Sequence, residues 1–279
     1  MTHEQKTILI TGCSSGIGYD CAHGLAEHGW RVFATCRKAE DCARLESEGL
    51  ESFVLDYEDQ ASMEAAVAEV LKRTGGTLHA LFNNGAYGIP AYLEDLPVAA
   101  LRANFETNFF AQHELTRMLM PVFRAQGHGR ILMNSSVLGF AALRVRGSYN
   151  STKFAMEGWA DTLRLELDGT GIHVVLIEPG PITSDIRVKS QPHFEKWIDH
   201  ETSARAGQYK DVVIPRLYAE AGNPDPFELP ARAVTDVVIK ALEARSPRAR
   251  YRITKPTKVF WILKRLLPTR WLDRILLRV

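Results

Sequence analysis

The feature that most constrains this chain is a regular alternation of short apolar runs with longer amphipathic segments. Strands that helices cover on both faces are nearly continuous in apolar character, and a repeated strand–helix–strand order requires right-handed crossovers between parallel strands. The sequence therefore predicts an α/β fold, a doubly wound parallel sheet in a single domain. The expected strands are residues 6–11, 31–36, 52–56, 78–83, 130–135 and 173–179, and the expected helices are residues 16–28, 39–48, 60–73, 98–126 and 148–168.

Composition sets the class of protein. With 279 residues, of which 46% are hydrophobic and 24% charged, the chain has the size and balance of one large globular domain. Its first residues, MTHEQKTILI, lack the basic start and apolar run of a secretory signal, and no apolar stretch approaches the ~20 residues of a membrane-spanning helix. The four cysteines have no CxxC spacing and the nine histidines are scattered, which predicts reduced thiols, no bound metal and a cytoplasmic location.

A glycine-rich segment, TGCSSGIG, joins the first expected strand to the first expected helix. Gly12 allows a tight turn, Gly16 allows close approach of the backbone to a ligand, and Gly18 allows tight packing of helix on strand. The backbone N–H groups and the helix dipole then favour a phosphate group. A glycine-rich turn without a ligand is the alternative, but the position between strand and helix favours a dinucleotide site. The predicted loop comprises Gly12, Ser14, Ser15, Gly16, Ile17 and Gly18.

The ends of the second and third strands indicate which dinucleotide binds. Arg37 and Lys38 follow the second strand, and no acid appears there until Glu40. An enzyme that prefers NAD places an acid at this point to bind the ribose, whereas two cations suit the 2′-phosphate of NADP(H). The alternative is a solvated basic helix start. Asp56, after the third strand, either accepts a hydrogen bond from the adenine amino group or caps the following helix.

These residues, taken with motifs further along, resemble the short-chain dehydrogenase/reductase family over nearly the whole chain, to about residue 245. The matching motifs are Thr11-Gly12-x-x-x-Gly16-x-Gly18, NNGA at 83–86, Asn108 in ETNFF, Ser136 in NSSVLG, Tyr149-x-x-x-Lys153 and EPGPI at 178–182. Within the family, YNSTKFAMEGWADTLRLEL and VLIEPGPI are similar to the branch of 17β-hydroxysteroid and retinol dehydrogenases and related aldehyde reductases. The resemblance implies a Rossmann-like sheet of about seven strands with helices on both faces.

The chain departs mildly from the family pattern at Ala111, three places after Asn108, and at two further points. The family usually has Asn-Asn-Ala-Gly where this chain has Asn83-Asn84-Gly85-Ala86, and because both exchanged residues are small the backbone course should survive. The threonine that often contacts the nicotinamide carboxamide falls at Ser184, with Thr183 one place earlier. For the cofactor, the resemblance implies contacts from Asn83, Asn84, Gly85, Tyr149, Lys153, Pro179, Gly180, Ile182 and Ser184.

The resemblance also implies catalytic roles for Asn108, Ser136, Tyr149 and Lys153. Tyr149 is the expected acid/base, and Lys153, one helical turn on, supplies an ammonium that lowers the pKa of the phenol from about 10 and also binds the nicotinamide ribose. Ser136 holds the substrate oxygen, with Ser135 as the competing candidate. Asn108 holds a water that links Lys153 to solvent.

Residues 185–230 correspond to a mobile lid over the substrate in this family. Within it, Phe194, Trp197, Ile198 and Tyr209 either line an apolar pocket or form the lid's own packing. Further pocket candidates are Tyr87, Leu138, Phe140, Leu143 and Arg146. An apolar lid predicts a hydrophobic carbonyl or alcohol as the substrate. The predicted activity is an NADP(H)-dependent oxidoreductase that interconverts such a carbonyl and its alcohol.

The C-terminal tail is the other unusual feature. Residues 245–279 hold 11 Lys and Arg and one acid, Asp273. We divide the chain into a domain at 1–254 and a basic amphipathic tail at 255–279, whose segments 257–267 and 269–278 either lie on an anionic membrane or pack on protein. A nucleic-acid partner is not expected, because no recognised binding module accompanies the tail.

The sequence also allows two other functions, and the family resemblance bears on the oligomeric state. A non-catalytic nucleotide sensor predicts that Tyr149 or Lys153 is missing, and both are present. A peripheral membrane protein predicts lipid binding without turnover. The family resemblance implies a homodimer or homotetramer with residues 98–126 and 148–168 as contact faces.

Overall fold

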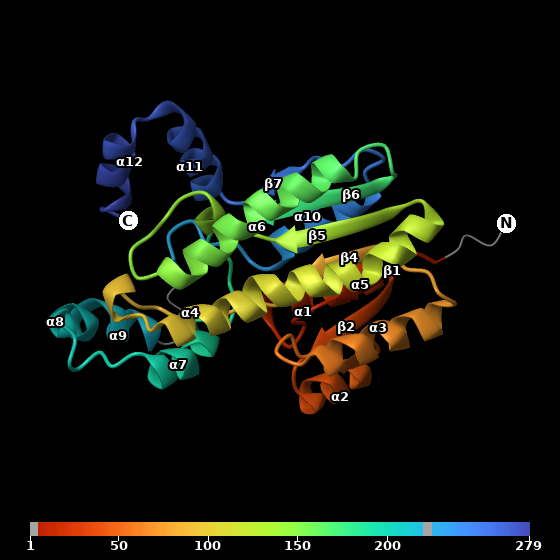
Figure 1. Cartoon of the computed structure of the whole chain (residues 1–279), viewed down its shortest axis with the longest axis horizontal. Helices are drawn as coiled ribbons and strands as arrows, with labels where there is room; N and C mark the ends of the chain where they lie inside the picture. The colour runs from red at the N-terminus through yellow and green to blue at the C-terminus, as the bar shows by residue number, and fades with distance from the viewer. Residues whose placement is uncertain (1–4, 220–224) are drawn as a thin grey trace.

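A computed structural model describes residues 5–219 and 225–279, so part of the predicted lid, residues 220–224, lies outside the described residues. The described chain forms a seven-stranded sheet in the order β3-β2-β1-β4-β5-β6-β7, and every pair of neighbours is parallel (Figure 1). The doubly wound parallel sheet is therefore confirmed. Its strands are β1 (Thr7–Ile10), β2 (Arg31–Cys36), β3 (Glu51–Val54), β4 (Ala80–Asn83), β5 (Gly129–Asn134), β6 (Ile172–Glu178) and β7 (Arg250–Arg252).

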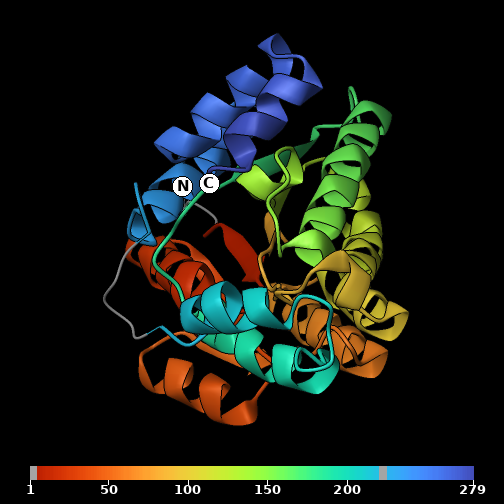
Figure 2. The same cartoon turned by 90° about the vertical axis from the view of Figure 1, so that its left-hand side faces the viewer.

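Helices cover both faces of this sheet (Figure 2). Neighbouring residues of β1 point to opposite faces, so Ile8 and Ile10 pack against α1, α2 and α10 while Leu9 packs against α3, α5 and α6. The covering helices are α1 (Gly16–Glu27), α2 (Ala39–Ser47), α3 (Gln60–Thr74), α5 (Ala111–Gln126), α6 (Gly147–Glu166) and α10 (Arg232–Glu243), while α4 (Val98–Phe105) packs against α6 and the lid cluster. Both layers bury apolar residues, which is why the strands read as continuous apolar runs.

The predicted helix 98–126 is interrupted rather than uniform. A π-helical segment, η2 (Glu106–Phe110), lies between α4 and α5 and carries Asn108. Such single wide turns inside α-helices occur frequently at functional sites. Apolar spacing does not reveal one extra residue in a turn, so the sequence pattern gave no sign of it.

The predicted lid contains helices of its own. They are α7 (Ile186–Trp197), α8 (Ala206–Gln208), the π-helical η4 (Tyr209–Val213) and α9 (Ile214–Leu217), with the 3-10 turn η1 (Leu93–Asp95) beside them. Phe194, Ile198 and Tyr209 are buried in a separate apolar cluster with Tyr87. Of the two alternatives for these residues, the structure supports the lid's own packing.

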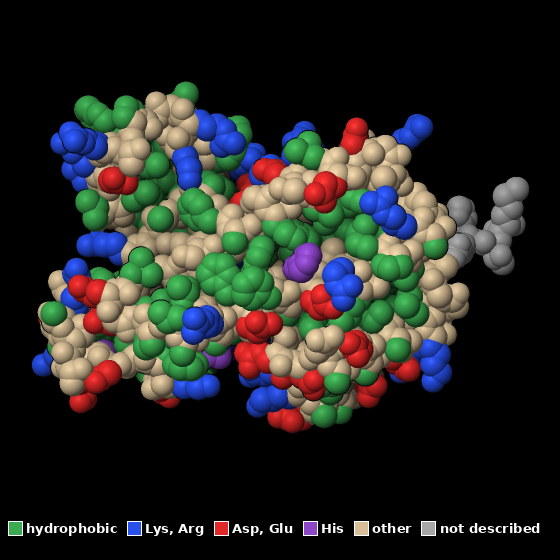
Figure 3. All heavy atoms as spheres, in the orientation of Figure 1, with side chains coloured by type: hydrophobic (Ala, Val, Ile, Leu, Met, Phe, Trp, Pro, Cys, Tyr) green, Lys and Arg blue, Asp and Glu red, His purple; other side chains and the backbone are tan. Residues whose placement is uncertain are grey.

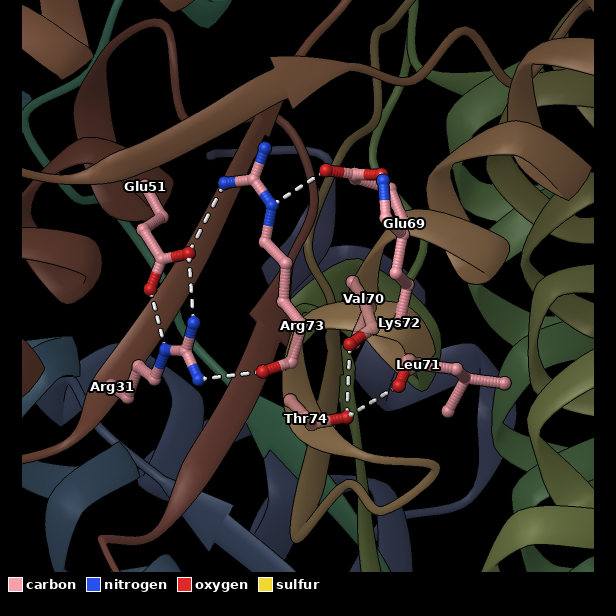
Figure 4. Close-up of polar contacts among 8 residues, drawn as sticks. All are labelled: Arg31, Glu51, Glu69, Val70, Leu71, Lys72, Arg73 and Thr74. Carbon is pink, nitrogen blue, oxygen red and sulfur yellow. Dashed lines mark hydrogen bonds and ion pairs between the residues drawn. The ribbon is translucent and has the colours of Figure 1, made fainter.

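Ion pairs join β2, β3 and α3 at the amino ends of the two strands (Figure 4). Arg31 Nε lies 2.5 Å from Glu51 Oε1, and Arg73 Nη1 lies 3.1 Å from Glu51 Oε2. Arg73 Nε also pairs with Glu69 Oε1 at 2.7 Å. These contacts hold together the amino ends of the strands. Ligands of such folds bind at the other end, outside the carboxyl ends of the strands.

The tail forms two helices, α11 (Lys255–Leu266) and α12 (Thr269–Leu276), which project beyond β7 (Figure 1). Within the described residues, no helix has both the length and the apolar character needed to span a membrane.

Candidate active site

The site lies where the chain winds away from the middle of the sheet in two directions. β1 and β4 are neighbours, yet the chain leaves β1 toward β2 and leaves β4 toward β5, which opens a crevice at their carboxyl ends. The glycine loop follows β1 and the segment Asn83–Gly85 follows β4. A Cβ on Gly12 would lie 2.7 Å from the Cα of Gly85, and one on Gly18 would lie 2.4 Å from the Gly12 carbonyl oxygen. Both positions therefore require glycine.

The exchanged pair Gly85-Ala86 has a local reason. A Cβ on Gly85 would lie 3.0 Å from Cε2 of Tyr57, so glycine there makes room for this buried ring. The Tyr57 hydroxyl donates to Thr11 Oγ1 at 2.7 Å and to Asn83 Oδ1 at 3.2 Å. Tyr57 thus links the two loops, a role that the sequence pattern did not indicate.

Thr11, Asn83 and Asn84 hold the two loops together. Thr11 Oγ1 accepts hydrogen bonds from the backbone N–H of Asn84 and of Gly85, at 2.9 and 3.1 Å. The Asn84 amide donates back to the Thr11 carbonyl at 2.9 Å. Asn83 is fully buried, and its amide donates to Thr116 Oγ1 at 3.0 Å. The side chain of Asn83 is therefore committed to the protein beneath the crevice.

Cations gather around Ser14 in the glycine loop. Arg44 Nη2, from α2, donates to the Ser14 carbonyl at 2.7 Å, and Lys189 Nζ, from α7, donates to Ser14 Oγ at 3.0 Å. Ser15 begins α1 in an extended conformation, and its side chain does not cap the helix. First-turn N–H groups without a side-chain cap suit an anion. The sequence pattern gave no signal for Arg44 or Lys189, since neither lies near the loop in the chain.

Arg37 and Lys38 lie exposed after β2. Lys38 Nζ pairs with Glu40 Oε1 at 3.5 Å, so the first acid of α2 already neutralises part of its charge. Burial raises the pKa of Tyr87 and lowers that of His193; the charge of Arg37 opposes the first shift and adds to the second, so Arg37 lies near both side chains. Its side chain therefore extends toward the lid.

Asp56 does not cap α3, and that alternative is wrong. The N-cap of α3 is Asp59, whose side chain accepts a hydrogen bond from the N–H of Ala61 at 2.9 Å. The carboxylate of Asp56 instead accepts from the N–H of Glu58 at 3.0 Å, in the turn before the helix.

The two hydroxyls after the Pro-Gly pair are also distinguished. Thr183 Oγ1 donates to Glu228 Oε1 at 2.7 Å, so it faces the last residues of the predicted lid. A Cβ on Gly16 would lie 3.1 Å from the Cβ of Ser184, which places Ser184 against the glycine loop. Pro179, Gly180 and Ile182 precede them; the Pro179 carbonyl accepts from Val137 N–H at 2.7 Å, and Ile182 pairs with Leu229.

Helix α6 carries the Tyr–Lys pair toward the ends of β4 and β5. Lys153 is 1% exposed, its Nζ lies 5.4 Å from the centre of the Tyr149 ring, and it donates to the Asn134 carbonyl at 2.6 Å. The Asn134 amide in turn donates to Asn84 Oδ1 at 2.8 Å. Lys153 is therefore tied to the crevice through the end of β5.

Ser136 and Ser135 diverge. Ser136 begins the short turn η3 (Val137–Gly139) and interacts with Tyr149, whereas Ser135 Oγ donates to the Glu157 carboxylate on α6. The structure therefore brings Ser136, rather than Ser135, to the phenol.

Burial governs the charge state of this pair. Desolvation raises the pKa of Tyr149, and the hydrogen bond with Ser136 lowers it by a smaller amount. Desolvation lowers the pKa of Lys153 from 10.5 to about 7, against the opposing charge of Glu157. The sequence predicts that the ammonium lowers the pKa of the phenol; in the protein by itself, burial outweighs that effect.

Asn108 lies at the wide turn of η2 and is fully buried. Its amide donates to the Tyr87 carbonyl at 2.8 Å and to Thr152 Oγ1 at 3.3 Å, and its oxygen accepts from the Tyr87 N–H at 3.0 Å. Asn108 thus holds the loop after β4 against the residue that precedes Lys153.

Arg146, just before α6, faces the lid. Its pKa is lowered to about 10 by burial and by the charges of Arg216 and Arg187, and Asp225 opposes this. The two oxygens of Asp225 pair with Arg187 and Arg216 at 3.4 and 3.0 Å. Among the described residues, Arg146, Arg187 and Arg216 are therefore three cations around one carboxylate, that of Asp225.

A doubly wound sheet with a glycine loop at the point where its winding reverses defines a dinucleotide-binding α/β protein. Comparison with known proteins gives the family: a short chain dehydrogenase profile matches residues 6–194. The chain belongs to the short-chain dehydrogenases, which are oxidoreductases that use a nicotinamide cofactor.

Relatives and solved structures agree with this assignment. The chain is 38% identical over 272 residues to the uncharacterized oxidoreductase YbbO of Escherichia coli K12, covering 98% of this chain and 94% of that protein. It is 32% identical to the NADPH-dependent 3-dehydrocapnine reductase of Ornithobacterium rhinotracheale, covering 96% and 94% of the two chains. A short-chain dehydrogenase of Burkholderia phymatum in complex with NAD has the same fold, with a TM-score of 0.78 at 22% identity over 95% and 94% of the chains.

Proposed function

We propose that the protein is an NADP(H)-dependent oxidoreductase that interconverts a hydrophobic carbonyl compound and its alcohol, with Tyr149 as the acid/base. The observation that carries this proposal is the meeting of Ser136, Tyr149 and Lys153 beside the crevice of the glycine loop. The loop fits a dinucleotide, because Gly12 and Gly18 leave no room for side chains and the start of α1 has no side-chain cap. The cofactor would supply or accept the hydride.

The protein groups handle the proton and the oxygen. Burial raises the pKa of Tyr149, so its hydroxyl is protonated at neutral pH and would donate that proton to the nascent alkoxide in the direction of reduction. Ser136 holds the carbonyl oxygen near that phenol and stabilises charge as it develops. Lys153, bonded to the Asn134 carbonyl, would bind the nicotinamide ribose and stabilise the phenolate that remains.

A screen of carbonyl compounds that follows NADPH absorbance tests this function. Tyr149→Phe should lower turnover by about 10²- to 10⁴-fold, the usual contribution of a positioned acid, while cofactor binding is retained. Turnover at the wild-type rate in Tyr149→Phe would exclude the proposed role. A wild-type chain that binds NADPH but reduces no carbonyl would favour the nucleotide sensor.

The preference for NADP(H) rests on charge. Arg37 and Lys38 are exposed after β2, where an acid would repel a 2′-phosphate. One relative is named as NADPH-dependent and one structure of the same fold holds NAD, so the family accepts both cofactors. Arg37→Ala should weaken NADPH binding by about tenfold to a hundredfold, the value of one charge-assisted hydrogen bond, and leave NADH binding unchanged. Equal losses for both cofactors would contradict the assignment.

The substrate and setting are proposed on similar grounds. A hydrophobic carbonyl is proposed from the apolar residues in the lid sequence, 185–230, although Phe194 and Tyr209 themselves pack within the lid; clear preference for small charged carbonyls would contradict it. The four buried free thiols suit the cytoplasm, where thiols stay reduced.

A hollow of about 310 Å³ between α5 and α6, lined in part by Met120, Trp159 and Leu163, suits a homodimer or homotetramer built on these helices. Light scattering of the purified protein would measure its mass directly.

A further inference from the structure

The tail is docked firmly on the domain. A Cβ on Gly180 would lie 2.1 Å from Thr254 Oγ1, so the start of α11 presses on the chain after β6. Lys264 Nζ donates to the Phe140 carbonyl at 2.5 Å, and Arg144 Nη2 donates to the Leu277 carbonyl at 3.1 Å. One face of the tail therefore packs on the domain, as one of the two alternatives predicted. The opposite, outer face makes none of these contacts.

The outer face of α11 carries an exposed apolar stripe. Val259, Ile262 and Leu266 are 50%, 47% and 74% exposed. Their spacing of three and four residues places them on one side of the helix. The opposite side holds the buried Thr257 and the inward-bonded Lys264. A stripe that large and regular is unusual on a surface that meets only water.

Cations border this stripe. Lys255 begins it, and Lys258 and Arg265 lie along one side of it by helical geometry, all three exposed. Trp271 on α12 and Leu277, which directly follows this helix, are 61% and 56% exposed. Arg270, Arg274 and Arg278 accompany them, and Asp273 is the one acid in residues 255–279. Figure 3 shows hydrophobic side chains among Lys and Arg over the region that α11 and α12 occupy in Figure 1.

We propose that the outer face of α11 and α12 binds the surface of an anionic phospholipid bilayer, with both helices lying in the interface. The combination of an apolar stripe, a tryptophan and flanking cations matches the layered chemistry of such a surface, which is negatively charged outside and apolar within. Long Arg and Lys side chains can reach the headgroups while the stripe enters the acyl boundary. A protein partner of opposite charge would match the cations but leave the stripe unexplained.

The position of this face has a consequence for the site. α11 and α12 contact the segment 137–146, which joins Ser136 to the start of α6. Binding would therefore set the Ser136 side of the site near the bilayer, where hydrophobic carbonyl compounds collect. This consequence depends on the proposed function, whereas the binding itself requires neither cofactor nor turnover.

Sedimentation of the full chain with vesicles tests the proposal. We expect binding to vesicles of phosphatidylglycerol and phosphatidylcholine in equal parts, weak binding to phosphatidylcholine alone, and loss of binding at high salt. Leu266→Glu should lower the partition coefficient by about tenfold, since it removes apolar contact and adds a repelled charge.

Leu165→Glu is the matched control. Leu165 is 69% exposed, against 74% for Leu266, and lies on α6 about 16 Å beyond Phe154, over which Lys264 is placed. Because α6 is also a proposed subunit contact, light scattering first checks that Leu165→Glu keeps the wild-type mass, and the variant should then bind vesicles like the wild type. The proposal fails if the wild type does not sediment with anionic vesicles, or if Leu165→Glu loses as much binding as Leu266→Glu. It also fails if Leu266→Glu breaks an oligomer that forms without lipid, because the face would then be a subunit contact.

Discussion

Lys153→Met should change how the stability of this protein depends on pH. The lysine is 1% exposed, and burial lowers its pKa from 10.5 to about 7. Between these values the folded protein releases the proton while the unfolded chain keeps it. The unfolded state then binds more protons, so the free energy of unfolding of the wild type rises with pH through this window. Below pH 7 the charged lysine is fully destabilising.

The size of the effect follows from the same shift. A pKa difference of about 3.5 units corresponds to a cost of about 5 kcal/mol for burying the ammonium, at about 1.4 kcal/mol per unit. From pH 7, where the folded lysine is half titrated, to pH 9 the wild type should gain about 2 kcal/mol relative to Lys153→Met. Methionine also loses the bond to the Asn134 carbonyl, but that cost does not vary with pH.

Urea unfolding of both proteins between pH 6 and 10 measures this difference. Subtracting the two free energies of unfolding at each pH removes the titration of the groups that do not interact with Lys153. Lys72→Met, at a lysine whose side chain is 79% exposed, controls for the general effect of deleting a positive charge. A difference between wild type and Lys153→Met that stays flat from pH 7 to 9 would refute the reasoning that burial, rather than Glu157, sets the charge of Lys153.

Three further substitutions probe the glycine loop and the lid. Gly18→Ala should cost about 1–3 kcal/mol, because its Cβ would lie 2.4 Å from the Gly12 carbonyl oxygen; an unchanged melting temperature in calorimetry would contradict this. Lys189→Met should raise the Kd for NADPH by about tenfold in a fluorescence titration while Lys196→Met, on the same helix, leaves it unchanged; equal effects would exclude a specific role for Lys189. Arg146→Met should lower kcat/KM for a carbonyl substrate with a distant carboxylate more than for its neutral analogue of equal length, and identical losses would remove this residue from substrate binding.

The arrangement of the sheet follows directly from the sequence, because both faces of each central strand are buried. The expected strand 31–36 and the observed β2 coincide, and the expected helix 60–73 ends one residue before α3. The family resemblance implies about seven strands, but the apolar runs did not locate β7, since Arg250 and Arg252 flank its single buried residue, Tyr251. Those arginines are tolerated because each lies within 3.1 Å of Glu178, which is fully buried on β6. An ion pair between residues far apart in the sequence produces no periodic pattern, so the pairing of β7 with Glu178 could not be predicted.

The candidate site divides in the same way. The motif spacing selects Ser136 over Ser135; in the structure Ser135 is bonded to Glu157, and Ser136 interacts with Tyr149. Lys189 could not be found from spacing, because it reaches the glycine loop from 175 residues away. The charge state of Tyr149 could not be found either, since it depends on how completely neighbouring atoms exclude water.

A charged network joins the tail to the catalytic helix and accounts for the basic character of β7. Glu157, one turn beyond Lys153, pairs with Arg250 at 3.1 Å, and Arg250 also pairs with Glu178. The Trp261 ring of α11 lies between Arg252 and Arg265, at 4.0 and 3.9 Å from their guanidinium carbons. Arg250 and Arg252 of β7 therefore neutralise buried acids of the domain, and Arg250 opposes the rise in the pKa of Glu157 that burial causes. Helix α11 contacts this network through Trp261 and Arg252, so a chain cut before β7, rather than at residue 255, would leave Glu178 and Glu157 without their cations.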